Sequence, residues 1–532
     1  MKKYNQYKLL LGVCALSLFT ACNYEEINTN PYEMTDEMGE MDGIAVGGPI
    51  LAMERWVFPV GTQADGTDYV NKYQTAYHLS ADVWSGYFSQ DNNWYSGNNH
   101  QTYYLQDAWV SDTYTYSYTE PFASWKKAKR QAEKTGSEAP YALAQILKIS
   151  AWHKTLETFG PIPYKHAGEA ALVIPFDKEE EVYDAMFADL QSAITTLTPL
   201  AEQGGTVAAD FDAVYAGKAD KWVKYANSLM LRLAMRLKFV APEKAKQWVK
   251  TALEQGVMES KDDEAKMEIG AGYIFANNIS YCAIQYGETR MCTSMFAYLA
   301  GYEDPRLSKY FSPSESKDAI PAFDNNSYAP VPPGHTTGGD AFQEYSLPNI
   351  AGNAPTYWMR ASEVYFLRAE AALEWPEFGD AASLYEQAVQ MSFEENGLSA
   401  SEATAYLATG KKPIDVEIAG YRASAPTTAT AEFTGSNEEK LEKIMIQKWI
   451  ALYPNGQEAW TEWRRTGYPK LNLVKVNNGS GQGVTKEKGI RRMVYPVKFS
   501  QSAEDRANYE KAVEMLKDKA DKPTSRLWWD VR

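Results

Sequence analysis

The sequence predicts a mainly α-helical protein, in which a tetratricopeptide-like helical repeat scaffold carries long irregular loops. Two observations lead to this prediction. Apolar residues recur every three or four positions over four long stretches, which is the spacing of one face of an α-helix. Between these stretches lie long segments that are rich in Asn, Gly, Pro, Ser and Tyr and have no period. Loops of that length are uncommon in compact proteins and are often functional.

The N-terminus predicts export and a lipid anchor. A basic start precedes an apolar stretch from Leu9 to Phe19 that is too short to span a membrane, and this pattern is typical of a secretory signal peptide over 1–21. The motif FTAC, which ends at Cys22, resembles a bacterial lipobox, although Phe19 stands where Leu is usual. We therefore predict that Cys22 is lipidated. In the alternative, an ordinary signal peptidase cleaves the chain and Cys22 has no role.

The residues after this cysteine predict a tether and then one folded unit. Residues 22–42 are polar and acidic without periodicity, which is typical of a flexible segment. No other run approaches the roughly 18 apolar residues of a spanning helix. We expect residues 43–532 to form a single helical domain.

Three of the helical stretches are amphipathic helices, at 141–159, 182–200 and 222–237. The last of them is the clearest, because its apolar residues fall on one face while Arg232 and Arg236 fall on another. Pro242 follows and is predicted to end this helix.

The fourth helical stretch predicts a helical hairpin. Residues 361–393 read as two helices separated by a turn at 376–379. The second helix matches the A-x3-Y-x2-A part of the tetratricopeptide pattern. Because one such hairpin cannot bury its apolar face alone, we expect these units to stack.

The irregular segments at 82–104, 270–290 and 323–355 are the candidate binding loops. A sugar ring has an apolar C–H face and a rim of hydroxyls, so a sugar site needs flat aromatic rings and amide, carboxylate or guanidinium groups. The first two loops offer this mixture. The candidate ligand-binding residues are Trp84, Trp94, Tyr95, Asn277, Asn278, Tyr281, Tyr286 and Arg290. In the alternative, these rings anchor the loops onto the helical body.

The charge of the chain argues against a polyanionic partner. The formal net charge is −16, and removing the first 21 residues, which carry three lysines and no acid, takes it to −19. Nucleic-acid binding depends on dense Lys and Arg, and no such tract occurs, so no nucleic-acid partner is expected. A neutral or cationic ligand fits this charge better.

The sequence carries no recognisable catalytic or cofactor motif. None of the five histidines has the spacing of a metal-ligand pair, and there is no G-x-S-x-G elbow, phosphate-binding loop or dinucleotide fingerprint. We expect no enzyme activity, no cofactor and no metal site built from a sequence motif, and a calcium site formed by carboxylates of distant loops stays an open alternative. Cys282 and Cys292 either form a disulfide or remain two free thiols, and a helix at this position would separate them too far to pair.

Several motifs in a fixed order resemble the SusD/RagB family of outer-membrane nutrient-binding lipoproteins, specifically its SusD-like branch. The strongest lies near the C-terminus, and the similarity runs over nearly the whole mature chain. The motifs are ETFGPIPY at 157–164, KYANSLMLRLAMRL at 224–237, YEDPRLSKYF at 302–311, EVYFLRAEAALEW at 363–375, IMIQKWIALYPNGQEAWTEWRRTGYPKL at 444–471, RRMVYPVKFSQSAEDRANYEKA at 491–512 and LWWD at 527–530. We assign the Gly, Pro and aromatic residues of the FGPIPY and YPNGQEAWTEWRRTGYP segments structural roles, with Arg464 and Arg465 stacking on Trp460 and Trp463.

The resemblance implies a function and a partner. Relatives act as a lid over a SusC-like TonB-dependent transporter and capture an oligosaccharide without making or breaking a bond. The leading hypothesis is therefore a glycan-binding lipoprotein on the outer membrane. Two alternatives remain: a peptide-binding lid of the RagB type, which the negative charge would favour for cationic peptides, and a tetratricopeptide-like scaffold that holds another protein.

Overall fold

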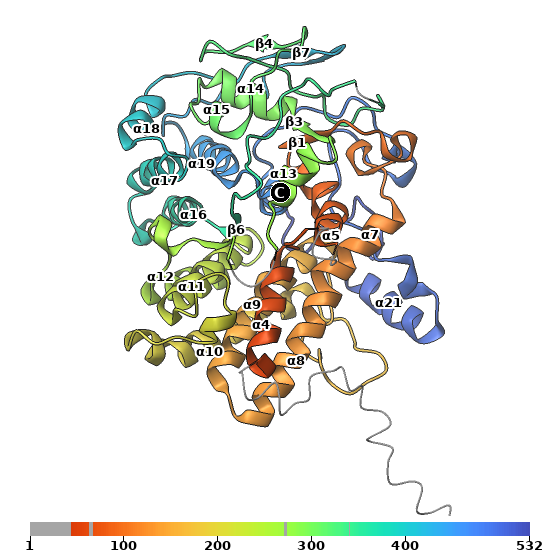
Figure 1. The fold of residues 1–532 in the computed structure, drawn as a ribbon, viewed down its shortest axis with the longest axis vertical. Coiled ribbons are helices and arrows are strands. Elements are labelled where there is room, and N and C mark those ends of the chain that lie inside the picture. Colours follow the sequence, from red (N-terminus) through yellow and green to blue (C-terminus); the bar gives the residue numbers. More distant parts are fainter. Residues whose placement is uncertain (1–43, 63–67, 271–273, 340) are drawn as a thin grey trace, which may run out of the picture.

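The computed structural model describes residues 44–62, 68–270, 274–339 and 341–532 (Figure 1). The predicted signal peptide, the lipidation site Cys22 and the tether at 22–42 lie outside these ranges. The α-helices are α4 (Ile44–Val57), α5 (Tyr69–Tyr73), α6 (Ala81–Trp84), α7 (Asp107–Tyr114), α8 (Glu120–Thr135), α9 (Glu138–Phe159), α10 (Glu179–Glu202), α11 (Ala219–Arg236), α12 (Pro242–Gln255), α13 (Asn278–Ile284), α14 (Thr293–Gly301), α15 (Leu307–Tyr310), α16 (Ala361–Glu374), α17 (Ala381–Glu395), α18 (Ala400–Leu407), α19 (Asn437–Leu452), α20 (Gly456–Thr466) and α21 (Ala503–Met515).

The strands are short and pair only in twos within the described residues. They are β1 (Phe88–Gln90), β2 (Ala265–Met267), β3 (Thr289–Met291), β4 (Ile320–Pro321), β5 (Ser327–Tyr328), β6 (Thr356–Met359), β7 (Val416–Ile418) and β8 (Tyr421–Ala423). The antiparallel pairs are β1–β3, β2–β6, β4–β5 and β7–β8. The fold is therefore mainly α-helical, as predicted.

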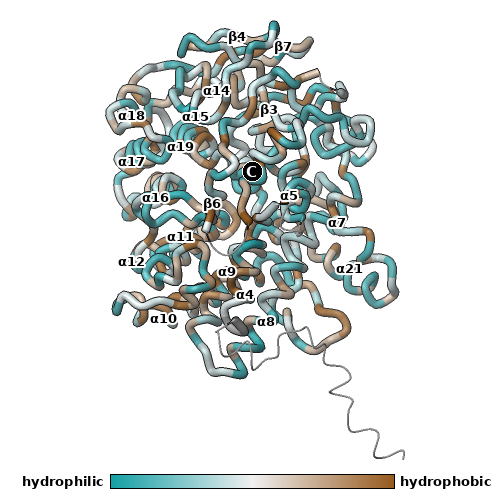
Figure 2. Tube along the Cα trace, viewed as in Figure 1, coloured by the Kyte–Doolittle hydropathy of each residue, from teal (hydrophilic) through white to brown (hydrophobic). Residues whose placement is uncertain are grey.

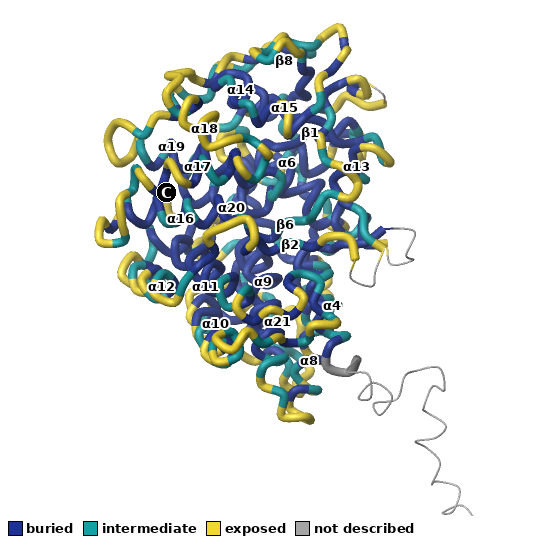
Figure 3. Tube along the Cα trace, turned by 60° about the vertical axis from the view of Figure 1, so that its left-hand side comes forward, coloured by how far each residue is buried: buried dark blue, intermediate teal, exposed yellow. Residues whose placement is uncertain are grey.

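The helices form a continuous stack along one side of the molecule. In Figure 1 it runs up the left edge from α10 through α11 to α16 and α17, and each of these helices packs on the next, while α12 packs on α11. Figure 2 shows hydrophobic residues gathered in the interior around α9 and α4, and Figure 3 shows the buried residues at the centre with exposed loops at the periphery. No described helix has both the length and the apolar character needed to cross a membrane.

The predicted helical hairpin is confirmed. Helices α16 and α17 are joined by a 3-10 turn at Pro376–Phe378, and Gly379 takes a positive φ of 131°, which a residue with a Cβ adopts with strain. Asp380 then caps α17 by accepting a hydrogen bond from the backbone N–H of Ser383 at 2.7 Å. The inward-facing residues of the two helices are fully buried or nearly so.

The other three helices are confirmed as well, with one difference at the end of α11. That helix ends at Arg236, and a turn follows before Pro242 begins α12 at its first position. Pro242 therefore starts the next helix and does not end α11 itself, because proline fits the first turn of a helix, where its missing N–H has no intrahelical partner.

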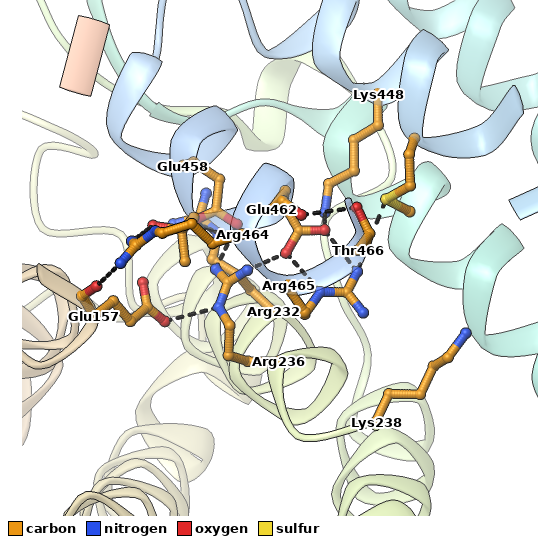
Figure 4. Close-up of polar contacts among 12 residues, drawn as sticks. Glu157, Arg232, Arg236, Lys238, Lys448, Glu458, Glu462, Arg464, Arg465 and Thr466 are labelled. Carbon is orange, nitrogen blue, oxygen red and sulfur yellow. Dashed lines mark hydrogen bonds and ion pairs between the residues drawn. The ribbon is translucent and has the colours of Figure 1, made fainter. Parts of the chain in front are cut away.

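Both faces of α11 are buried, so the arginines on its polar face, Arg232 and Arg236, lie in the interior of the protein (Figure 4). The Arg236 guanidinium donates from Nε to Glu157 of α9 at 2.9 Å and from Nη2 to Glu458 of α20 at 2.6 Å, and it also pairs with Glu462. Arg232 pairs with Glu363 of α16 at 2.7 Å. These ion pairs tie four helices together across the core.

Helix α20 belongs to the segment that was assigned a structural role, and its burial agrees with that assignment. The Arg464 guanidinium lies over the Trp460 ring at 3.4 Å, as the predicted stacking requires. Arg465 instead forms an ion pair with Glu370 at 2.7 Å, and Trp463 lies beside Arg491 at 5.1 Å. The two described cysteines, Cys282 and Cys292, are free and buried.

Candidate functional site

The first two candidate binding loops lie side by side in the structure. Strand β1 of one pairs with β3 of the other, with Phe88 opposite Met291 and Gln90 opposite Thr289. Just beyond the pair, the backbone N–H of Asp91 donates to the carbonyl of Glu288 at 2.6 Å. The residues after β1 and before β3 therefore emerge at the same end of this small sheet.

The third loop joins them at the same place. A ring nitrogen of His335 contacts the carbonyl oxygen of Gln90 at 2.5 Å, and the backbone N–H of Phe342 donates to Asp91 at 3.1 Å. The Asn93 amide donates to the carbonyl of Thr336 at 3.4 Å. Segments separated by more than 200 residues in the sequence thus form one loop face.

Two aromatic rings stand out from this face, and we call Trp94 and Tyr95 the aromatic platform. Their exposed fractions are 39% and 52%. Both rings pack against the buried Trp109 of α7, with centroids 6.4 Å and 5.6 Å away in edge-to-face geometry. Trp109 therefore fixes the platform from below and leaves its outer side open.

The backbone of the platform is strained. Tyr95 and Ser96 both have a φ of 54°, in the left-handed region that residues other than glycine rarely occupy. Each such residue costs about 1–3 kcal/mol and persists only where neighbours impose it, most often at functional sites. Here the side-chain amide of Asn99 donates a hydrogen bond to the Trp94 carbonyl at 2.8 Å, and that of Asn478 donates to the Gly97 carbonyl at 2.8 Å.

Tyr281 and Tyr286 form a second aromatic pair. Both are half-buried, and their rings meet edge to face with centroids 5.1 Å apart. The Tyr286 hydroxyl donates to the Asn71 side chain at 2.5 Å. Burial raises the pKa of the Tyr286 hydroxyl well above its usual range, so it remains a neutral hydrogen-bonding group at physiological pH.

A buried carboxylate connects the platform to the second loop. Glu288 accepts hydrogen bonds from the amides of Gln74 at 2.5 Å and Asn92 at 3.5 Å, and from Trp94. Burial raises the pKa of this carboxyl group, and the hydrogen bonds oppose the shift. Glu288 is therefore a positioning group beneath the platform.

Glu288 is also part of a polar cluster with the donor set of a metal site. His78, Cys282 and Glu288 bring one possible ligand atom each within 4.8 Å of one another. All three already have protein partners, since His78 contacts Asp82 at 3.0 Å and Thr289 at 2.6 Å, and the Cys282 thiol hydrogen-bonds Glu288. The contacts account for these residues as an internal hydrogen-bond network, and the expectation of no metal stays a prediction.

Four of the eight predicted ligand-binding residues are in the interior and hold the loops to the body. Trp84 donates its indole N–H to the carbonyl of His100 at 2.8 Å, and Asn277 caps α13. Asn278 donates to the carbonyl of Pro59, and Arg290 donates to the carbonyl of Phe342 at 2.8 Å. These contacts correspond to the anchoring alternative, and we confine the candidate ligand surface to Trp94, Tyr95, Tyr281 and Tyr286.

Sequence reasoning missed the residues that support this surface. Trp109, Asn71 and Glu288 are single residues without a local motif, and each matters only through a contact that folding creates. The candidate surface presents flat rings and neutral hydrogen-bonding groups, and its chemistry is that of recognition.

Comparison with known proteins gives a consistent assignment. The family described as "Susd and RagB outer membrane lipoprotein" matches residues 26–530. A chitin-binding SusD homologue from Flavobacterium johnsoniae is 33% identical with a TM-score of 0.83, and the match covers 92% of this chain and 99% of that one. A SusD homologue from Bacteroides vulgatus is 32% identical with a TM-score of 0.83, over 92% and 99% of the two chains.

Other solved structures agree. A SusD homologue from Bacteroides thetaiotaomicron is 29% identical with a TM-score of 0.81, and the match again covers 92% and 99% of the two chains. A further structure, described as a chitin-binding protein, is 25% identical with a TM-score of 0.71, over 91% of this chain and 100% of that one. No curated protein sequence matches the chain.

Proposed function

The chain belongs to the SusD and RagB family of outer membrane lipoproteins, and on that premise we propose that it binds oligosaccharides at the cell surface and delivers them to a SusC-like TonB-dependent transporter. SusD-like proteins are binding proteins without catalytic activity. The transporter partner and the lipid anchor at Cys22 follow from the family resemblance and the N-terminal motif.

The aromatic platform is the observation that carries the proposal. A sugar ring stacks its apolar C–H face on a flat aromatic ring, and large aromatic side chains supply the apolar area for such a contact. Trp94 and Tyr95 are large, exposed and held by a strained backbone over Trp109. The nearby amides of Asn92 and Asn93 supply polar groups of the kind that sugar hydroxyls need.

The relatives support a glycan as the ligand class. Two of the similar structures are described as chitin-binding, one of them 33% identical to this chain. We therefore place oligomers of N-acetylglucosamine among the first glycans to test.

Glycan-array binding of the mature chain without Cys22, followed by calorimetry, tests the proposal. We expect at least one neutral oligosaccharide to bind. The double variant Trp94→Ala with Tyr95→Ala loses two stacking surfaces, so its affinity should fall roughly tenfold or more.

The matched control is Phe323→Ala, because Phe323 is an aromatic residue of similar exposure, 37%, next to β4 and outside the platform. It should bind like the unchanged chain. Equal affinities of the control and the double variant would rule out the platform as the glycan surface.

Peptide capture is the second candidate, and the net charge of the chain is the observation that favours it. A formal charge of −16 attracts cationic peptides, and salt screens that attraction. Raising NaCl from 50 to 500 mM should leave the affinity for a neutral oligosaccharide within about twofold. A ligand whose affinity falls steeply over that range would favour the peptide alternative.

A further inference from the structure

A hollow whose lining does not include the platform residues Trp94 and Tyr95 plays no part in the proposed function. It has a volume of about 450 Å³. It lies where the end of α20 and the segments 467–474 and 486–491 meet the C-terminal tail, residues 526–532. Trp84 and Gln101 of the first loop form part of its floor. Because exposed residues such as Lys470 and Arg526 line it, the hollow opens to solvent. We call it the basic pocket.

The charge of the basic pocket is opposite to that of the chain. One acid, Glu487, is present among the residues that line it. Six cations line it, namely Arg464, Lys470, Lys486, Arg491, Arg526 and Arg532. In a chain with a net charge of −16, such a concentration of positive charge around one hollow sets up a local field that attracts anions.

Three of these cations have an acidic partner in the protein itself, and two of the three share one carboxylate. Arg491 pairs with Asp530, with Nε at 2.8 Å from a carboxylate oxygen, and Arg526 lies 3.5 Å from the same Asp530. Arg532 pairs with Glu438 at 2.5 Å.

The other three have no ion pair within 4 Å in the described part of the chain. Lys486 donates to the carbonyl of Lys475 at 2.7 Å, and the Lys470 ammonium lies 5.2 Å from the centroid of the Tyr468 ring. Arg464 donates to the carbonyls of Glu157 at 2.6 Å and Arg491 at 2.9 Å. The pocket therefore retains positive charge that the fold does not neutralise.

Arg464 contributes to this charge although it is fully buried. Burial lowers the pKa of its guanidinium to about 9, Asp530 opposes this shift, and the neighbouring Arg491 adds to it. A guanidinium remains protonated at neutral pH, so the wall of the pocket keeps a fixed positive charge.

The remaining lining is suited to a sugar ring. Trp463, Tyr468 and Tyr103 are half-buried rings on its walls. The side-chain oxygen of Asn472 is buried and has no hydrogen-bond partner, although a buried amide oxygen normally has one. A ligand hydroxyl in the pocket would supply the missing donor.

We propose that the basic pocket binds an acidic saccharide unit, with its carboxylate or sulfate at Lys470 and Lys486, in the field of the buried Arg464, and its ring against the aromatic walls. The aromatic platform would then bind neutral sugar rings, and the basic pocket would bind an acidic substituent. That the pocket takes an anion follows from its own residues. That a sugar carries the anion rests on the proposed function.

Calorimetry with three probes tests the proposal: a trimer of galacturonic acid, a sulfated galactose disaccharide and inorganic sulfate. We expect at least one of the two acidic sugars to bind more tightly than inorganic sulfate, with an affinity that weakens as NaCl rises. Lys470→Glu combined with Lys486→Gln should lower that affinity at least tenfold. The glutamine keeps a donor for the carbonyl of Lys475.

The matched control is Lys127→Glu on α8, an exposed lysine that does not line the pocket. This control and the double variant Trp94→Ala with Tyr95→Ala should bind the acidic sugar normally. Circular dichroism confirms that each variant is folded.

Four results would overturn the proposal. They are no binding of either acidic sugar at millimolar concentration, binding of inorganic sulfate as tight as that of the sugars, an equal loss in Lys127→Glu, and a loss in the platform variant alone. The last result would place the acidic sugar on the platform, so the proposed function would stand while the second site would not. The first would leave an acidic protein segment as the class of occupant to examine.

Discussion

The exposure of Trp94 and Tyr95 depends on a few hydrogen bonds to a turn that is locally unfavourable. Two consecutive left-handed residues would relax in an isolated peptide, and amides from Asn99 and the distant Asn478 hold them here. Trp109 then supports both rings from below. Single residues beneath the surface thus decide whether the platform exists.

Glu288 is the residue on which we expect ligand affinity to depend without direct contact. Glu288→Gln places an amide N–H opposite donors of Gln74, Asn92 and Trp94, so one buried hydrogen bond is lost. The free energy of unfolding should fall by about 1–3 kcal/mol. Glycan affinity should fall several-fold, since Trp94 loses its anchor, and calorimetry checks this.

Gln285→Ala is the control for that variant, because Gln285 is exposed on the same segment. It should leave both stability and affinity unchanged. Unaltered affinity in Glu288→Gln would mean that the network beneath the platform does not position it.

Glu179 at the start of α10 gives a prediction about pH. Burial raises the pKa of its carboxyl group to about 8, above the ordinary value of 4.5, although the backbone N–H of Trp528 donates to it at 3.0 Å. Between these two values the folded state binds more protons than the unfolded state. Its contribution to stability is therefore greatest below about pH 4.5 and is lost as pH rises to 8.

Glu179→Gln removes this titration. Urea unfolding at pH 5.5 and pH 8.0 should show that the unchanged chain loses stability relative to the variant at the higher pH. Glu180→Gln, which changes an exposed carboxylate one position along, should show no such difference. A parallel pH dependence in all three proteins would contradict the assignment.

At the scale of elements, tertiary packing determines whether the charged face of an amphipathic helix is exposed to solvent or buried. Helix α11 is buried on both faces because α9, α16 and α20 surround it, and its arginines are paired with their carboxylates. Pairing avoids the large cost of an isolated buried charge.

Arg236→Met therefore has a strong expected effect. It leaves Glu157, Glu458 and Glu462 without their shared cation, and breaking a buried pair by removing one partner costs about 3–5 kcal/mol. Chemical denaturation measures the change. Lys246→Met, which removes a surface pair with Glu377, is the control and should leave stability nearly unchanged.

At the scale of the whole molecule, one hydrophobic cluster extends from Ile50 near the start of the described chain to Trp529 near its end. Its continuity supports the proposal that residues 43–532 form a single domain. Tryptophan fluorescence and circular dichroism should then report one coincident thermal transition.

Trp529→Ala tests whether the C-terminal tail belongs to that unit. Its ring is fully buried between Arg236 and Arg464, and truncating a buried tryptophan costs about 3–5 kcal/mol. The single transition should shift to lower temperature without splitting, while Phe323→Ala, which truncates an exposed ring outside the platform, should leave it in place. Two separate transitions would argue for more than one domain.

Much of the fold was determined by the sequence itself. Apolar residues that recur every three or four positions specify α9, α10, α11 and the α16–α17 hairpin, since helix amphipathicity is a local property. The order of the motifs along the chain indicated the family, and the comparisons confirmed it.

Only the tertiary structure decided which loop residues face outward. The same mixture of aromatic and amide side chains serves as an anchor at Trp84, Asn278 and Arg290 and as a surface at Trp94 and Tyr95. Burial depends on partners such as Trp109 and Phe342, and composition does not encode them. The basic pocket is another example, because its cations come from separate segments and their charges add only where folding brings them to one hollow.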